Sequence, residues 1–196
     1  MRKLTLLLFL TLSSTVNAIT ITFDDHPDAT QNSYGVIGTY KGYVFGSTFP
    51  ADRMDWVDTV DSAFDYGSIS GDFTMLNNYG GNASITDKNN ADFTFDGVWA
   101  KRWRTPPESG DYYNYGTIQG YNNDVLIWEI ETATNGSFTF FEAKTEPIDK
   151  LILEFAGAYM VDDLSLNTVA TVPIPASIWL FGSGLIGLIG FARRRK

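Results

Sequence analysis

The chain has 196 residues, with 23 acidic and 14 basic side chains, one histidine and no cysteine. All of the acidic residues but only eight of the basic ones fall within residues 19–171, which gives that segment a net charge of −15. A surface this acidic repels nucleic acids and anionic lipids, so no nucleic-acid partner is expected. Because the chain cannot form disulfides, a domain of this size depends on its hydrophobic core.

The first 18 residues have the pattern of a secretory signal peptide. Arg2 and Lys3 precede an apolar run over residues 4–12, and a polar stretch then ends in Val16-Asn17-Ala18. The apolar run is about half of the roughly 20 residues that a membrane helix needs. We therefore expect signal peptidase to remove residues 1–18 and leave a mature chain that begins at Ile19.

Residues 19–166 are expected to form a single all-β domain. Apolar and polar residues alternate in short runs between turn residues, and no stretch carries the apolar stripe of an amphipathic helix. An Asn135-Gly136 pair predicts a tight hairpin. This spacing predicts a two-sheet antiparallel sandwich of the jelly-roll type. The expected strands are 19–23, 41–48, 54–60, 72–76, 83–86, 92–101, 116–121, 125–131, 137–141, 151–155 and 159–167.

The segment 99–115 interrupts the alternation as a long loop or an overgrown hairpin. Sugar rings stack on aromatic rings, and neighbouring Arg or Asp side chains hydrogen-bond their hydroxyl groups. The aromatic residues of this segment are therefore candidates for glycan binding. The alternative is that they pack the core and the loops, as Trp128 is expected to do. The candidates are Trp99, Trp103, Tyr112, Tyr113 and Tyr115.

Two aspartate pairs, Asp24-Asp25 and Asp162-Asp163, lie near the two ends of the domain. Asp25 and Asp162 fall in register with the apolar residues of the first and last expected strands, which directs both toward the core. A buried carboxylate is costly unless it is paired or binds a metal. If these strands pair, the four aspartates would converge on one Ca²⁺, which prefers oxygen ligands. The alternative is that backbone N–H groups and water satisfy them at the strand ends.

No catalytic residue is expected. His26 is the only histidine and lies in Asp24-Asp25-His26-Pro27, where a solvated turn residue is expected. Without a cysteine or a Gly-x-Ser-x-Gly motif, the chain shows no sign of a hydrolase triad. A glycosidase with paired carboxylates stays open as an alternative, because 23 acidic residues always supply pairs.

The C-terminal residues have the pattern of a membrane anchor. Residues 167–175 are a Thr/Val/Pro linker, residues 176–192 carry no charge, and residues 193–196 form a basic tail of Arg193, Arg194, Arg195 and Lys196. The uncharged stretch is close to the lower length limit for a membrane helix. Arginines retain their end of such a helix in the cytoplasm, so we expect the domain to lie outside the inner membrane.

This C-terminus resembles the PEP-CTERM sorting signal. Val172-Pro173-Ile174-Pro175-Ala176 is similar to the Val-Pro-Leu-Pro-Ala variant of its motif, and the apolar stretch and the arginines follow in the same order. The sorting residues are thus Val172, Pro173, Pro175 and Ala176. The resemblance implies export through the inner membrane of a Gram-negative-type bacterium and processing by an exosortase, often in cells that make exopolysaccharide. The glutamate of the Pro-Glu-Pro form is missing here.

The central domain resembles the passenger domains of such proteins. It opens on Ile21-Thr22-Phe23-Asp24-Asp25 and closes on Met160 to Leu166, with Gly71-Asp72-Phe73 and Phe93-Thr94-Phe95 between them. The resemblance implies a jelly roll like those of carbohydrate-binding modules and galactose-binding-like domains.

We therefore expect an exported, exosortase-sorted cell-surface or extracellular-matrix protein that is not an enzyme and binds glycan or other envelope components. One alternative is a purely structural or adhesive protein of the biofilm matrix, without a small-ligand site. The other is a secreted hydrolase that acts on glycans.

Overall fold

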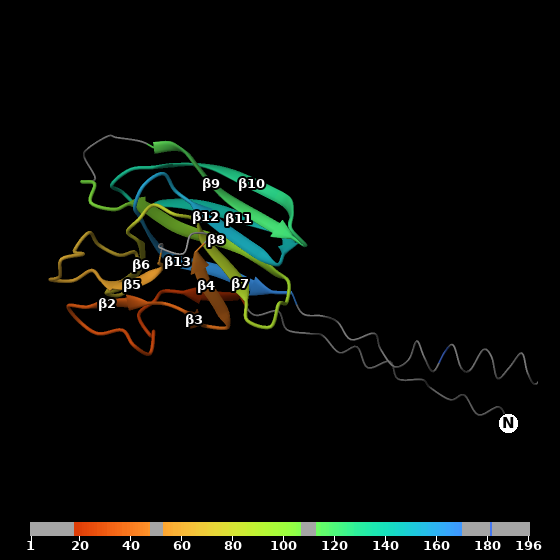
Figure 1. Cartoon of the computed structure of the whole chain (residues 1–196), viewed down its shortest axis with the longest axis horizontal. Helices are drawn as coiled ribbons and strands as arrows, with labels where there is room; N and C mark the ends of the chain where they lie inside the picture. Colours follow the sequence, from red (N-terminus) through yellow and green to blue (C-terminus); the bar gives the residue numbers. More distant parts are fainter. Residues whose placement is uncertain (1–17, 48–52, 107–112, 170–180, 182–196) are drawn as a thin grey trace, which may run out of the picture. The chain divides into compact units, whose positions relative to one another are not determined.

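The computed structural model describes residues 18–47, 53–106, 113–169 and 181. Thirteen β-strands lie between Ala18 and Thr168 and form two layers (Figure 1). Within the described residues, no helix has the length and apolarity needed to cross a membrane. The predicted span at 176–192 lies outside them except for Phe181, and so do the signal peptide, the sorting motif and the basic tail.

The strands form two antiparallel sheets, so the predicted all-β jelly-roll sandwich is confirmed. Sheet A has the order β11-β8-β13-β6-β5-β2, with β1 also on β13, and sheet B has the order β10-β9-β12-β7-β4-β3. The strands of sheet A are β1 (Ala18–Ile21), β2 (Tyr34–Val36), β5 (Asp55–Asp58), β6 (Phe73–Asn77), β8 (Phe93–Arg102), β11 (Thr139–Ile148) and β13 (Tyr159–Thr168). Those of sheet B are β3 (Thr39–Tyr40), β4 (Tyr43–Ser47), β7 (Ala83–Asp87), β9 (Tyr113–Asn122), β10 (Val125–Thr134) and β12 (Lys150–Glu154).

The main core lies between the two sheets, where alternate residues of each strand face inward. Trp128 of β10 belongs to this core, as predicted, and its ring centroid lies 5.6 Å from that of Phe95 on β8. The indole packs over Gly120 of the neighbouring strand β9, where an added Cβ would lie 2.3 Å from it. Gly120 therefore makes room for the Trp128 indole in the core.

A second apolar cluster lies on the outer face of sheet A, the face turned away from the main core. Val57, Leu76 and Met160 face this way, because their strand neighbours point into the main core. Trp103 completes the buried part of the cluster. Residues 61–72, which include Phe64 and Tyr66, cover it; we call them the covering segment.

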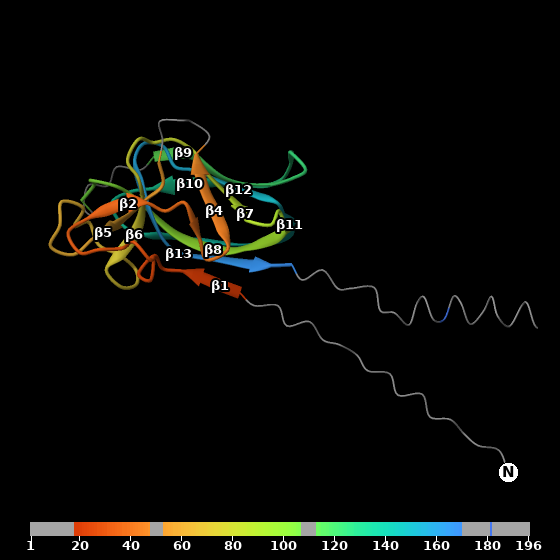
Figure 2. The same cartoon turned by 60° about the horizontal axis from the view of Figure 1, so that its bottom comes forward.

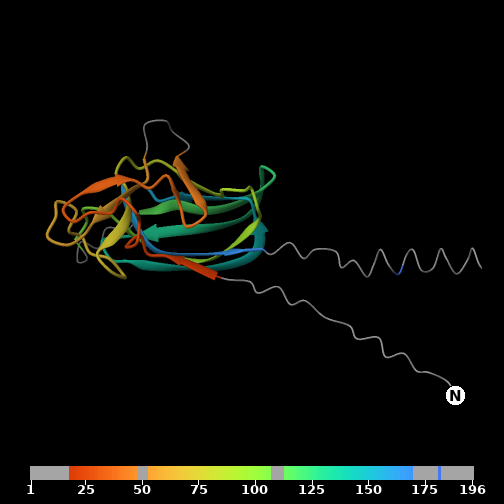
Figure 3. The ribbon, with the colours of Figure 1, turned by 90° about the horizontal axis from the view of Figure 1, so that it is seen from below.

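Strand β13 changes partner on one of its edges. Its residues Tyr159–Val161 pair with β6, and its residues Leu164–Asn167 pair with β1, as Figures 2 and 3 show for the red and blue strands. The register shifts between these two halves, and Asp163 has a positive φ of 46°. The start of β1 therefore lies beside the end of β13, with Ala18 opposite Asn167.

Two expectations about the strands need correction. The turn at Asn135-Gly136 does not form a hairpin within one sheet, because β10 belongs to sheet B and β11 to sheet A. It packs instead against the end of β8, where Arg102 N donates to Asn135 O and a Cβ at Gly136 would lie 2.1 Å from Thr105 O. Strands β2 and β3, of three and two residues, were not predicted.

Candidate functional site

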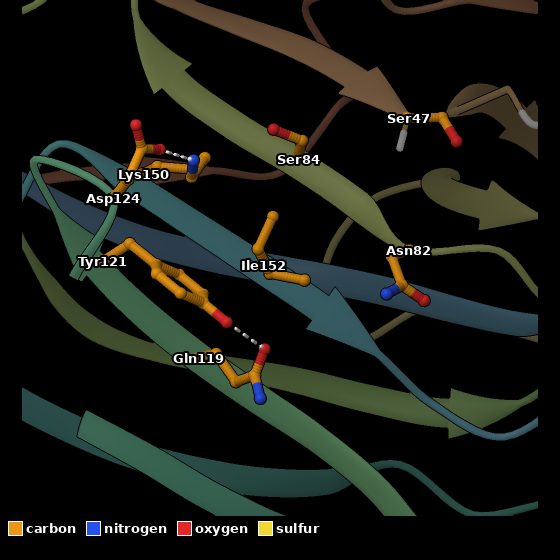
Figure 4. Close-up of a pocket in the computed structure, with 8 residues that line it drawn as sticks. All are labelled: Ser47, Asn82, Ser84, Gln119, Tyr121, Asp124, Lys150 and Ile152. Atoms are coloured by element: carbon orange, nitrogen blue, oxygen red, sulfur yellow. Dashed lines mark hydrogen bonds and ion pairs between the residues drawn. The ribbon is translucent and has the colours of Figure 1, made fainter. Parts of the chain in front are cut away.

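A shallow groove of ≈ 420 Å³ crosses the outer face of sheet B (Figure 4). Its walls and floor combine amide, hydroxyl, ammonium and carboxylate groups with one aromatic ring and one aliphatic side chain. We call it the sheet-B groove. The residues that line it are Ser47, Asn82, Ser84, Gln119, Tyr121, Asp124, Lys150 and Ile152.

The strand register brings these residues together from distant parts of the chain. Ile152 of β12 lies opposite Ser84 of β7 on one side and Gln119 of β9 on the other. Lys150, two residues before Ile152 on β12, likewise lies opposite Tyr121 of β9. Because neighbouring strands are about 4.8 Å apart, side chains of the same face form rows with that spacing. The groove is thus built from parallel rows of side chains that cross the strands, most of them polar, with Ile152 between Ser84 and Gln119.

Hydrogen bonds orient the polar groups of the groove. The Tyr121 hydroxyl donates to Gln119 Oε1 over 3.0 Å, and Gln119 Nε2 donates to Glu129 Oε2 over 2.5 Å. Figure 4 shows the Tyr121 side chain lying along the sheet toward Gln119. Lys150 Nζ lies 5.4 Å from the centroid of the Tyr121 ring. The groove therefore presents one aromatic ring with hydrogen-bond donors and acceptors fixed around it.

Lys150 and Asp124 form an ion pair of 2.8 Å at one end of the groove. Their hydrogen bond lowers the pKa of Asp124 and raises that of Lys150 from the ordinary values, so both are charged at neutral pH. Beyond this pair the surface continues into a second hollow of ≈ 420 Å³, whose lining includes Asp92 and Asp149. The hollow beyond the ion pair therefore adds two carboxylates to this face.

The predicted aromatic residues do not line the sheet-B groove. Trp99 lies on the outer face of sheet A, partly exposed, with its ring centroid 5.2 Å from that of Phe140. Trp103 is 6 % exposed and belongs to the second apolar cluster, so it is not the open stacking surface that was expected. Tyr112 and the side chains of Tyr113 and Tyr115 lie outside the described residues.

Trp103 does reach a smaller pocket, of ≈ 270 Å³, on the outer face of sheet A. We call it the outer pocket. The rings of Tyr34, Phe64 and Tyr79 also line it, together with Arg53 and other side chains. Tyr34 and Tyr79 are 54 % and 63 % exposed, and both lie in segments that sequence patterns mark only as turns. The sequence does not predict this pocket, because Tyr34 and Tyr79 are 45 positions apart in a part of the chain that is rich in loops.

Three of the four predicted metal-binding aspartates hold the covering segment in place. Asp162 is fully buried, and its Oδ2 accepts hydrogen bonds from Ile69 N at 2.7 Å and Ser70 N at 3.0 Å. Its Oδ1 accepts from Asp163 N at 2.8 Å, and Asp163 Oδ1 accepts from the Ser70 hydroxyl at 2.6 Å. Lys101 Nζ adds a hydrogen bond to the carbonyl of Tyr66.

Asp24 holds the C-terminal end of the covering segment. Its Oδ1 accepts hydrogen bonds from Asp72 N at 2.7 Å and Phe73 N at 3.1 Å. Gly71, with a φ of 53°, leaves room for this carboxylate, because an added Cβ would lie 1.9 Å from Asp24 Oδ1. We call Asp24, Asp162 and Asp163 the aspartate clasp. Two of its members, Asp162 and Asp163, lie on β13 between the stretch that pairs with β6 and the stretch that pairs with β1.

The expected directions of two aspartates were wrong for a local reason. The backbone turns at Phe23, which has a φ of 68°, so Asp25 is exposed and bonds to Tyr40 and Lys41. The shifted register of β13 turns Asp162 to the outer face, opposite to Leu164. His26 is also not solvated: it is 5 % exposed, and its Nε2 lies 3.0 Å from Ile37 O.

The four aspartates are therefore not arranged around a common cation. Their oxygens face backbone N–H groups, a tyrosine hydroxyl and a lysine, and the described residues hold no group of three or more acidic or histidine side chains suited to a metal. Calcium binding stays a prediction from the sequence. Thermal unfolding in Ca²⁺ and in EDTA measures it, with a raised midpoint expected if the ion binds the folded state.

No protein-family model matches this chain, and no curated protein matches it in sequence. Among solved structures, it is similar to the tandem CBM22-1-CBM22-2 domain of Xyn10C from Paenibacillus barcinonensis, with 12 % identity and a TM-score of 0.46 over 85 % of this chain and 49 % of that chain. The chain thus spans about half of that tandem. It is also similar to the single CBM22-1 xylan-binding domain of that protein, with 10 % identity and a TM-score of 0.46 over 82 % and 100 %. The family 29 carbohydrate-binding module CBM29_1 from Piromyces equi shows 10 % identity and a TM-score of 0.42 over 81 % and 94 %.

Proposed function

We propose that this chain is an exported, non-catalytic protein that binds a glycan chain in the sheet-B groove. The observation that carries the proposal is the rows of mostly polar side chains across β7, β12 and β9, with Ile152 and the Tyr121 ring among them. A sugar unit offers hydroxyl groups that both donate and accept hydrogen bonds, and one apolar ring face. The amide, hydroxyl and aromatic groups of the groove match that combination.

The open shape of the groove suits a chain better than a single small molecule. Small-molecule sites enclose most of the ligand surface in a largely apolar cleft. The sheet-B groove is instead a shallow, polar surface that continues past Lys150 into the neighbouring hollow. An extended glycan would lie across the strands and contact one row of side chains after another.

The residues that line the groove do not suit glycoside hydrolysis. That reaction needs two carboxyl groups about the scissile bond, one of which has a raised pKa and acts as the acid. Asp124 is the only acidic residue among those that line the groove within the described chain, and Lys150 lowers its pKa. We therefore propose binding without catalysis.

Export and sorting form the second part of the proposal. The N-terminal signal pattern, Val172-Pro173-Ile174-Pro175-Ala176 and Arg193 to Arg195 support signal peptidase and an exosortase-type enzyme as processing partners. The chain would be anchored in the inner membrane before processing, and would then reach the cell surface or an exopolysaccharide matrix. Cell fractionation with antibodies to residues 19–166 tests this, and full-length, uncleaved protein in the cytosol would contradict it.

Replacing Tyr121 with alanine is expected to weaken glycan binding at least tenfold, because its ring is the only aromatic one among the described residues that line the groove. A glycan array with the full-length protein, in a detergent without a sugar headgroup, identifies the ligand, and calorimetry then measures the affinity. Tyr121→Phe retains the aromatic ring and should lose less of the glycan affinity than Tyr121→Ala.

Two lysines provide a matched control. Lys150→Ala removes a groove residue and should weaken binding, whereas Lys144→Ala changes a lysine of β11 in the other sheet and should not. Array binding that survives both Tyr121→Ala and Lys150→Ala would exclude the sheet-B groove as the glycan site.

A further inference from the structure

We propose that the outer pocket of sheet A is a second binding site, separate from the sheet-B groove, and that it takes a single sugar unit bearing a carboxylate, such as a uronic acid. This inference goes beyond the proposed glycan groove, because the two sites lie on different sheets and share no lining residue. A volume of ≈ 270 Å³ is below the usual range for drug-sized ligands and suits one small ring.

Two buried polar atoms of the residues that line this pocket have no hydrogen-bond partner in the protein. They are Asp55 Oδ1, an acceptor, and Trp103 Nε1, a donor, and each residue is 6 % exposed. An unpaired buried polar atom costs about 1–3 kcal/mol, so such atoms need an explanation. A bound molecule with hydroxyl donors and oxygen acceptors would satisfy both once these two side chains turn toward the pocket, because neither atom is exposed at its wall in this structure. A sugar carries these groups close together on one ring.

The aromatic walls fit the rest of such a ring. Tyr34, from the edge strand β2, and Tyr79, from the turn after β6, stand largely exposed at the pocket. Phe64 supports Tyr34 in an edge-on contact with ring centroids 5.3 Å apart. The apolar face of a pyranose packs well against such rings.

The charge of the pocket points to an anionic sugar. Arg53 and Arg104 both line it, against the single carboxylate of Asp55, whereas residues 19–171 as a whole carry a net charge of −15. Arg53 uses one N–H group to bond Asp55 Oδ2 at 3.1 Å, and a guanidinium has five N–H donors in total. Arg104 lies over the Trp103 ring at 4.3 Å, which leaves the edge of its guanidinium for a carboxylate.

The test uses the indole N–H signal of Trp103 in the full-length, ¹⁵N-labelled protein, in a detergent without a sugar headgroup. Loss of one of the five tryptophan indole signals in Trp103→Phe assigns it. D-Glucuronate and D-galacturonate should shift this signal saturably, and D-glucose and D-galactose should bind at least tenfold more weakly. Raising the salt concentration should weaken only the acidic sugars.

The variants separate this site from the groove. Arg53→Gln should weaken the binding of the acidic sugars at least tenfold, and Arg104→Gln serves if that protein fails to fold. Tyr121→Ala in the groove and Lys144→Gln on β11 should leave the titration unchanged. Equal binding of neutral sugars, an absent Trp103 shift, or loss of the shift in Tyr121→Ala would each overturn the proposal. None of these results bears on whether a longer glycan binds the sheet-B groove.

Discussion

Replacing Asp162 with alanine is expected to lower the free energy of unfolding by about 3 kcal/mol or more, because three backbone N–H groups lose their acceptor. The N–H groups of Ile69, Ser70 and Asp163 donate to this buried carboxylate, and the first two hold the covering segment on sheet A. Urea unfolding measures the change. Asp65→Ala, at an exposed position of the same segment, is the control and should stay within about 0.5 kcal/mol of the wild type.

The same carboxylate makes stability depend on pH in a distinctive direction. Burial raises the pKa of Asp162 from 3.8 to about 7, although its three N–H donors oppose the rise. Between these pH values the folded state binds one more proton than the unfolded state. The stability that Asp162 contributes through its raised pKa is therefore fully present below about pH 4 and is lost as the pH rises to about 7. Asp162→Asn should lack this slope. Parallel stability curves for wild type and Asp162→Asn would contradict the expectation.

Replacing Trp103 with alanine is expected to cost about 3–5 kcal/mol, the usual range for removing a large buried aromatic side chain. The ring stacks on Phe64 with centroids 6.0 Å apart and meets Tyr66 edge-on at 6.2 Å, so the covering segment loses its main contact. Denaturant unfolding of the full-length protein measures the effect.

Trp99→Ala provides the matched comparison for Trp103→Ala. Trp99 lies two strand positions before Lys101 on the same outer face but is only partly buried, and among the described residues its ring contacts that of Phe140, so the loss of stability should be about 1 kcal/mol. If the two variants lose equal stability, Trp103 is not the anchor of the second apolar cluster.

The alternation of apolar and polar residues was enough to predict most strands and the two-sheet architecture. Strands such as β8 and β13 have long runs in which one face points into the main core, and their positions match the prediction within a few residues. The failures lie where a single backbone angle changes the pattern. The positive φ at Phe23 and the shifted register near Asp163 each move an aspartate to another face, and a residue pattern does not encode such angles.

The candidate sites were harder to predict, because each depends on contacts between distant segments. Ser84, Gln119 and Ile152 look like ordinary polar or apolar strand residues until the register places them in one row. Trp103 was predicted to belong to an exposed glycan-binding platform, but its side chain is only 6 % exposed. Its burial depends on residues 61–72 folding over sheet A, and their sequence, in which Phe64, Tyr66 and Ile69 are spaced among Asp, Ser and Gly, predicts no strand or helix.

The pairing of β1 with β13 also determines how the domain would respond to tension. Because Ala18 and Asn167 lie side by side, drawing the two ends apart would peel the four-residue strand β1 away one pair at a time, which takes little force. A load between Thr168 and a glycan held on sheet B would instead pull β13 lengthwise against β8, with which it pairs from Tyr159 to Thr168. Many hydrogen bonds would then have to break together, so the proposed anchor after the last strand would load the domain in its mechanically stronger direction.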